Sequence, residues 1–177
     1  MYKLIDILKI RSSKRNYINK DISNKDLTEI IEAASFSASA GGLYPWMIFV
    51  ITDKDKIKQI SGLPTYYQSW ISQAPCILII GIDKALSFEV YGTRGVNLYC
   101  IQDSAIACEN ILLSATEKGI GSCWVGSFYG EKIKQIIDMG KYYPVTIITL
   151  GYTAESKNEM NKQCKIKKEF WDNHVRW

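Results

Sequence analysis

Apolar residues recur at helical spacing in five segments of the chain. Where they stand at every third or fourth position, one face of a helix can be buried while the opposite face stays polar. In the second of these segments, Ser23 and Asp26 have the spacing of a capping box and mark the first turn. The pattern predicts helices over residues 4–10, 23–34, 53–60, 98–118 and 131–138.

Three short runs are apolar without that spacing, at 47–52, 76–82 and 144–152, and are predicted as buried strands. Because they alternate irregularly with the helices, the fold class is expected to be α+β. Glycine-containing stretches between these elements are predicted as loops, and Pro45 is expected to keep Tyr44 extended. The predicted loops are SASAGGLYPW (37–46), YGTRGVN (91–97) and GIGSCWVG (119–126).

Two segments indicate surfaces that need a partner. The predicted helix over 98–118 is apolar nearly all round, which is typical of a helix in a core or at a subunit interface. Residues 153–177 are polar and lysine-rich and show no core of their own, so Trp171 and Trp177 are expected to dock on another surface.

Composition narrows the functional class. A chain of 177 residues predicts one domain, and a net charge of +4 is too small to indicate nucleic-acid binding. No apolar run approaches a membrane span, and the first residues lack the apolar region of a signal peptide. Five cysteines without a CxxC pair indicate reduced thiols, so we expect a cytoplasmic protein.

The reactive side chains are few. His174 is the only histidine and lies near the C-terminus, which disfavours a Cys–His or Ser–His–Asp catalyst, and no zinc or phosphate-loop spacing occurs. The candidate acid–base residues are interpreted mainly as helix caps or surface charges; they are Asp103, Glu109, Glu117 and Glu131. A chain so poor in reactive groups favours chemistry performed by a cofactor.

Three segments are suited to hold such a cofactor. RSSKRNY (11–17) brings arginines and hydroxyls together as a phosphate site needs, although a basic surface turn would have the same composition. The predicted glycine loops at 37–46 and 119–126 allow a flat ring to approach the main chain. Together they favour a phosphorylated planar ligand.

These segments carry a resemblance to the FMN-dependent nitroreductase family. RSSKRNY is similar to its Arg-Arg-Ser-x-Arg segment, SASAGGLYPW to its Pro-Ser-x-x-Asn-x-Gln-Pro-Trp loop, and GIGSCWVG to its Gly-Leu-Gly-Ser-Cys-Trp-Ile-Gly. The resemblance implies a three-layer α/β/α sandwich with a mostly antiparallel sheet. It also implies a homodimer with FMN at the interface and a C-terminal extension, 153–177, that crosses to the partner.

Residue by residue, the resemblance assigns cofactor contacts and no catalytic side chain. The backbone of Gly126 is expected near flavin N5, with Cys123 a small wall residue and Trp124 a packing residue. The implied FMN-binding residues are Arg11, Ser12, Ser13, Arg15, Ser39, Ala40, Gly42, Gln68, Val125, Gly126, Lys165 and Lys167. No metal is implied.

The implied reaction is hydride transfer from NADH or NADPH through flavin N5 to a nitroaromatic, quinone or similar acceptor. Ala38, Gly42 and Ser12 depart from the family's usual Pro, Asn and Arg, and SAGGLYP is closer to the branch with peptide-azoline dehydrogenases. Three alternatives stay open: a dehydrogenase of a peptide-like substrate, an FMN-binding protein without turnover, and a protein-interaction module.

Overall fold

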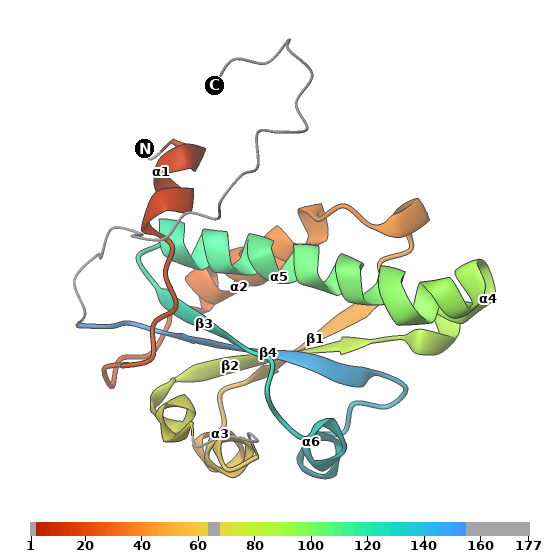
Figure 1. The fold of residues 1–177 in the computed structure, drawn as a ribbon. Coiled ribbons are helices and arrows are strands. Elements are labelled where there is room, and N and C mark those ends of the chain that lie inside the picture. The colour runs from red at the N-terminus through yellow and green to blue at the C-terminus, as the bar shows by residue number, and fades with distance from the viewer. Residues whose placement is uncertain (1–2, 64–67, 155–177) are drawn as a thin grey trace, which may run out of the picture.

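A four-stranded antiparallel sheet lies between two layers of helices (Figure 1). The computed structural model describes residues 3–63 and 68–154. The sheet has the order β1-β2-β4-β3. Its strands are β1 (Trp46–Ile51), β2 (Cys76–Ile82), β3 (Gly121–Val125) and β4 (Tyr143–Gly151). The α+β sandwich implied by the resemblance is confirmed, and its strand pairs are all antiparallel.

The helices cover both faces of the sheet. On one face lie α1 (Leu4–Ile10), α2 (Asn24–Glu32) and α5 (Cys100–Glu117), and on the other α3 (Lys54–Ser61) and α6 (Gly130–Ile136) (Figure 1). In β2, Leu78 and Ile80 belong to the α2–α5 core, whereas Ile77 and Ile79 belong to the α3–α6 core. A strand buried on both sides must be apolar at every position, which explains its continuous apolar run.

The prediction of a loop over 91–97 is wrong. Helix α4 (Lys84–Arg94) continues through it into a π-helical turn, Gly95–Tyr99, which leads directly into α5. At Gly92 the backbone has the non-helical values φ 58° and ψ −149°, a conformation that other residues rarely adopt, so two helical stretches meet there at a kink. The glycine marks a bend within the helix, and the sequence pattern alone does not distinguish a bend from an end.

The prediction of a loop over 119–126 is also wrong. Gly121–Val125 forms β3, in which Cys123 lies opposite Thr149 and Trp124 opposite Ile148 of β4. The partner strand comes from a segment some 25 residues away. Because pairing with β4 supplies the hydrogen bonds, the local glycines do not prevent a strand.

The other predicted elements are confirmed within a residue or two at most boundaries. Ser23 accepts a hydrogen bond of 3.1 Å from the amide of Asp26, as the capping box requires. The second helix ends at Glu32 and is followed by a 3-10 turn, Ala33–Phe36. The predictions made for Lys165, Lys167, Trp171, His174 and Trp177, and for the tail as a whole, lie outside the described residues.

Candidate functional site

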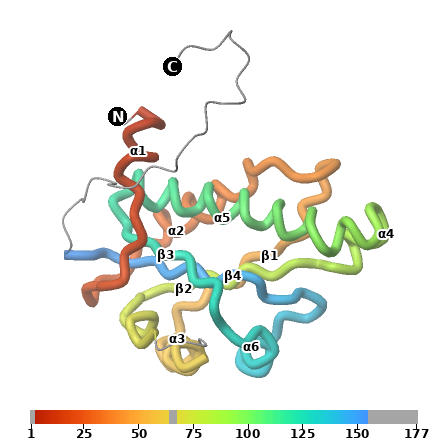
Figure 2. The backbone as a smooth tube through the Cα atoms, viewed as in Figure 1, coloured from red at the N-terminus to blue at the C-terminus, as the bar shows by residue number. Residues whose placement is uncertain are grey.

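The segment 11–17, called here the basic arm, is fixed along the free edge of the sheet. The amide of Lys14 donates a 2.9 Å hydrogen bond to the carbonyl of Ser122 on β3. The hydroxyl of Tyr17 donates to the carbonyl of Lys14 at 2.7 Å and shares a 2.6 Å hydrogen bond with the hydroxyl of Thr149 on β4. Figure 2 shows the arm descending from α1 past β3. These hydrogen bonds fix the path of the arm across β3 and β4.

A pair of opposed glycines makes room for the arm. Gly121 of β3 lies opposite Gly151 of β4. A Cβ atom at Gly121 would lie 3.1 Å from Cβ of Lys14, and one at Gly151 would lie 2.8 Å from Cδ1 of Tyr17. Gly121 belongs to the stretch 119–126, which was expected to let a flat ring approach the main chain. The space beside Gly121 is instead filled by the chain's own basic arm.

The basic side chains of the arm lie beside neutral and acidic neighbours. Nε of Arg11 is 3.8 Å from Oε1 of Glu109 on α5. The guanidinium of Arg15 lies 5.8 Å from the ring centre of Trp70. Trp70 belongs to the 3-10 turn Ser69–Gln73, which begins directly after Gln68. Gln68 therefore precedes by two residues the ring that Arg15 contacts.

Cys123 lies under the arm and is only 1% exposed. Burial raises the pKa of its thiol, while the positive charge of Arg15 acts in the opposite direction. The thiol is therefore neutral near pH 7, which agrees with its interpretation as a small wall residue. Trp124, next to it, is 38% exposed.

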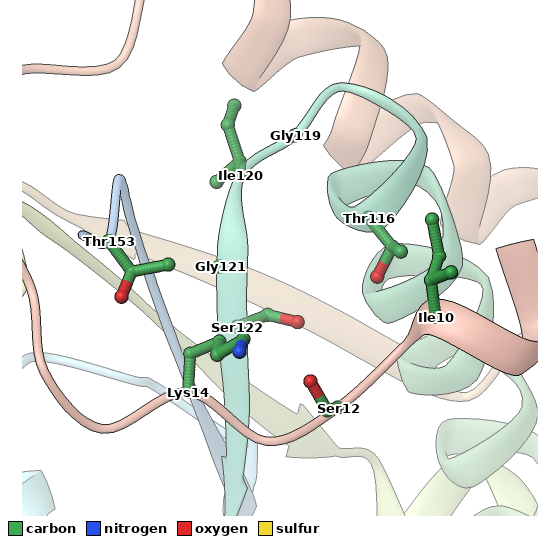
Figure 3. Close-up of a pocket in the computed structure, with 9 residues that line it drawn as sticks. All are labelled: Ile10, Ser12, Lys14, Thr116, Gly119, Ile120, Gly121, Ser122 and Thr153. Atoms are coloured by element: carbon green, nitrogen blue, oxygen red, sulfur yellow. The ribbon is translucent and has the colours of Figure 1, made fainter. Parts of the chain in front are cut away.

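A cavity of about 160 Å³ lies between the basic arm, β3 and the end of α5 (Figure 3). The hydroxyls of Ser12, Thr116 and Ser122 point into the same space. Oγ of Ser12 is buried and has no hydrogen-bond partner among the described residues. The cavity is lined by Ile10, Ser12, Lys14, Thr116, Gly119, Ile120, Gly121, Ser122 and Thr153. An unpartnered buried hydroxyl beside a basic segment is a feature that a phosphate- or hydroxyl-bearing ligand would satisfy.

The glycine loop, residues 37–46, is anchored by Asp103. The hydroxyl of Ser39 donates a 2.7 Å hydrogen bond to Oδ2 of Asp103, and the amide of Ala40 lies 3.1 Å from the same oxygen. Asp103 is 4% exposed. The interpretation of Asp103 as a cap is right, because it binds the first amide of the turn Ala40–Gly42. The interpretation as a surface charge is wrong, because the side chain is buried. The tertiary partner of this carboxylate has no signal in the sequence.

The prediction of an extended Tyr44 is wrong. Its φ is 47°, in the left-handed region. The amide of Tyr44 donates to Oγ of Ser39 at 2.8 Å, and its carbonyl accepts from the amide of Trp46 at 2.8 Å. These two local bonds hold a tight turn against the preference that Pro45 imposes on the residue before it.

The predicted cofactor residues fall into two groups at opposite ends of α5. Asp103 holds the glycine loop near the start of the helix, and Thr116 faces the basic arm near its end. Asp103 and Thr116 are thirteen positions apart, which corresponds to about 20 Å of helix, and Arg11 meets the helix between them at Glu109. One chain thus brings Arg11, Ser13 and Arg15 together near Cys123. The glycine loop, which leads into β1, lies toward the other end of the helical layer from the basic arm (Figure 1).

The remaining acidic candidates have surface roles. Glu109 is the partner of Arg11, and Glu117 and Glu131 are exposed. Across residues 3–63 and 68–154, no three His, Cys, Asp or Glu side chains gather as metal ligands would. In the same ranges, no helix is long and apolar enough to cross a membrane.

Solved structures of nitroreductases share the fold of this chain. An FMN-dependent nitroreductase from Clostridium difficile R20291 superposes with a TM-score of 0.80 and 28% identity, covering 97% of this chain and 99% of the other. A nitroreductase family protein from Streptococcus pneumoniae TIGR4 has a TM-score of 0.83 at 21% identity, over 93% and 96% of the two chains.

Sequence comparison agrees. An FMN reductase (NAD(P)H) from Bacillus subtilis is 25% identical over 169 residues, which cover 88% of this chain and 68% of the relative. The profile of the nitroreductase family matches residues 8–63 and 62–152. Because these two ranges span well over half of the sequence, the chain belongs to the nitroreductase family.

Proposed function

We propose that the protein is an FMN-dependent oxidoreductase that oxidises NADH or NADPH and works as a homodimer. In each of its two sites, the basic arm of one protomer faces the glycine loop of the other. The observation that carries this proposal is that, within one chain, the glycine loop is anchored at Asp103 near the start of α5, whereas the basic arm meets the same helix at Glu109 and near Thr116. In a twofold dimer with antiparallel α5 helices, the start of α5 in one protomer lies beside the end of α5 in its partner. The glycine loop of each protomer would then meet the basic arm of the other.

An exposed apolar surface supports a second copy as the partner. On α5, Ile101 and Ile106 are exposed although the helix also has a buried apolar face. Large apolar side chains are exposed beside it on α1 and in the turn after α2; they are Leu4, Ile5, Leu8 and Phe36. A groove of about 430 Å³ runs between these elements. Such a continuous apolar surface is typical of an interface that is covered in the functional protein.

The residues of the arm and loop fit FMN. Arg11, Arg15 and Ser13 supply charge and hydrogen-bond donors suited to a phosphate, and Ser12 has a buried hydroxyl without a partner. On the loop, a Cβ atom at Gly42 would meet nothing within 4 Å, so this surface is open to a ligand. The side chain of Val125 is buried, which leaves the backbone of Val125 and Gly126 as the groups that would face the ring. We further propose Lys165 and Lys167 as phosphate ligands.

FMN, when bound, would supply hydride and electron transfer between the nicotinamide and the acceptor. The protein would contribute binding and orientation. Its arginines would favour the anionic form of the reduced cofactor, since positive charge stabilises developing negative charge in a site that excludes water. No side chain is required as a nucleophile, which agrees with the neutral, buried Cys123. We propose nitroaromatics or quinones as acceptors and the cytoplasm as the location.

The absorption spectrum of the purified protein, followed by anaerobic titration with NADH and NADPH, tests this function. We expect a flavin spectrum that bleaches with at least one nicotinamide. A yellow protein that neither nicotinamide bleaches would favour the alternative of a carrier, or a dehydrogenase of a peptide-like substrate. A colourless protein whose melting temperature does not rise with added FMN would contradict the proposal, because a bound ligand stabilises the folded state.

A further inference from the structure

A series of contacts leads from the glycine loop to Arg94. A Cβ atom at Gly41 would lie 2.1 Å from the hydroxyl of Tyr91, so this hydroxyl rests directly against the loop. The ring of Tyr91 packs edge-on against that of Tyr99, with the ring centres 5.2 Å apart. Nε of Arg94 donates a 2.8 Å hydrogen bond to the hydroxyl of Tyr99. Arg94 is therefore connected through Tyr99 and Tyr91 to the loop that is proposed to line the flavin.

The backbone around Arg94 is irregular on both sides. Gly92 has a conformation that is nearly exclusive to glycine, and a π-helical turn, Gly95–Tyr99, follows Arg94 at once. A Cβ atom at Gly95 would lie 2.2 Å from the carbonyl oxygen of Ser87, so the turn can pack only with glycine there. π-helical turns are rare and occur frequently at functional sites. Here the turn places Tyr99 where its hydroxyl meets Arg94.

The charge of Arg94 is not neutralised. No carboxylate in residues 3–63 or 68–154 lies within ion-pair distance of it, whereas Arg11 and Lys141 each have one. The guanidinium lies 5.3 Å from the ring centre of Tyr99, and its Nε is used by the hydroxyl of that ring. The two terminal nitrogens of a guanidinium form a planar pair of donors suited to a carboxylate or phosphate.

We propose that Arg94 recognises an anionic group, a carboxylate or a phosphate, on the molecule that reacts against the glycine loop. This inference rests on the proposed function, because the loop is a reaction surface only if a flavin lies on it. The anionic group has two possible sources: the acceptor, or the additional phosphate that distinguishes NADPH from NADH. Tyr99 is a positioning residue that acts through its hydrogen bond to Arg94.

The test measures the two half-reactions of the FMN-loaded protein separately. Anaerobic stopped flow gives the reduction rate with NADH and NADPH, and the reoxidation rate with nitrobenzene and 4-nitrobenzoate. We expect Arg94→Met to lower the rate constant about tenfold for the more anionic member of one pair, corresponding to the loss of one charge-assisted contact. The other member should stay within about twofold, and the affected pair identifies the source of the anion.

A binding measurement and two variants complete the design. For an acceptor carboxylate, the dissociation constant of unreactive benzoate, read from the flavin spectrum, should also rise about tenfold in Arg94→Met. For the NADPH phosphate, the dissociation constant of NADP⁺ should rise relative to that of NAD⁺. Tyr99→Phe should change the same quantity in the same direction by less. Lys84→Met is the control, because it removes a cation that lies over Tyr143 at the far end of the same helix. It should not change the ratio of rate constants within either pair of substrates.

The outcomes separate this inference from the proposed function. If the protein binds FMN and is reduced, but Arg94→Met affects both members of each pair equally, the role of Arg94 is refuted and the proposed function stands. Equal effects of Lys84→Met and Arg94→Met would likewise refute it, since they would indicate only the general field of positive charge. Failure to bind FMN would overturn both.

Discussion

Gly121 of β3 lies directly opposite Gly151 of β4, and the basic arm crosses the sheet over this pair. Lys14 passes over the first glycine and Tyr17 over the second. The arm also donates to Ser122 and so gives the edge strand β3 a partner at one point. Small residues at the crossing therefore fix where the arginines of the arm are placed.

Gly151→Ala should destabilise the fold by about 1–3 kcal/mol, the usual cost of overpacking a filled site. The new Cβ would lie 2.7 Å from Cδ of Pro75 and 2.8 Å from Tyr17. Gly126→Ala is the control: its Cβ would meet only Trp124, at 3.6 Å, so its effect should stay within about 0.5 kcal/mol. Urea unfolding measures both. If the two variants were equally stable, the close packing of the arm against Gly151 would not contribute to the stability of the fold.

Gly126→Val should leave the fold intact and empty the flavin site, because the added side chain would occupy the space proposed for the ring. Cys123→Ala should keep its flavin content and turnover, since the thiol is neutral and buried. Flavin absorbance per chain and NADH oxidation rate are the measurements. Loss of activity in both variants with FMN retained would contradict the assignment of the backbone as the functional group.

Asp103→Asn should lower the free energy of unfolding by about 1–2 kcal/mol and weaken FMN binding. The carboxylate accepts hydrogen bonds from Ser39 and Ala40, and an amide cannot accept all of them. Glu131→Gln, an exposed change on α6 on the other face of the sheet, should alter neither quantity measurably. If the two variants behaved alike in urea unfolding and flavin titration, Asp103 would not be the anchor of the loop.

Cys108→Ala should show a stability deficit that shrinks at alkaline pH. Burial raises the pKa of the Cys108 thiol to about 12, from 9.0 for an ordinary thiol. Above pH 9 the unfolded chain loses this proton while the folded chain keeps it, so the thiol's contribution to stability falls as pH rises. At pH 10 the loss is about 1.4 kcal/mol.

The deficit of Cys108→Ala in urea unfolding, about 1–2 kcal/mol at pH 7, should therefore decrease by about 1.4 kcal/mol at pH 10. Ile111→Val removes core volume from the same helix without removing a titrating group, and its deficit should not depend on pH. A constant deficit for Cys108→Ala would mean that the thiol ionises as easily in the folded protein as in the unfolded chain.

Local pattern predicted most of the fold. Each correctly predicted element has either an apolar helical face, as in 4–10, or a continuous apolar run, as in 76–82. Buried positions are apolar, so the spacing of the apolar residues reveals the element. The two wrong loop predictions, over 91–97 and 119–126, share one cause. Gly92 and Gly121 were both interpreted as loop residues, yet one is a kink inside a helix and the other packs against the arm.

The site was predictable in residue type but not in arrangement. Charge and spacing indicate Arg11 and Arg15, and the glycines indicate the loop over 37–46, while the family resemblance adds the individual contact residues. The contact of Asp103 with Ser39 joins residues 64 apart, and nothing local to either one indicates it. The separation of the arm and loop along α5 could not be read from the sequence either, since it depends on how α5 packs between them.

Complementation between two defective chains tests most directly whether the site is shared by two protomers. Arg11→Ala/Arg15→Ala impairs the arm, and Gly42→Val impairs the loop, so each homodimer should lack intact sites. A heterodimer of the two variants, isolated with two different affinity tags, should contain one intact site and one doubly defective site. If each site is shared by two protomers, that heterodimer should hold about one FMN per two chains, against almost none in either homodimer. A heterodimer that binds no more FMN than the homodimers would contradict it.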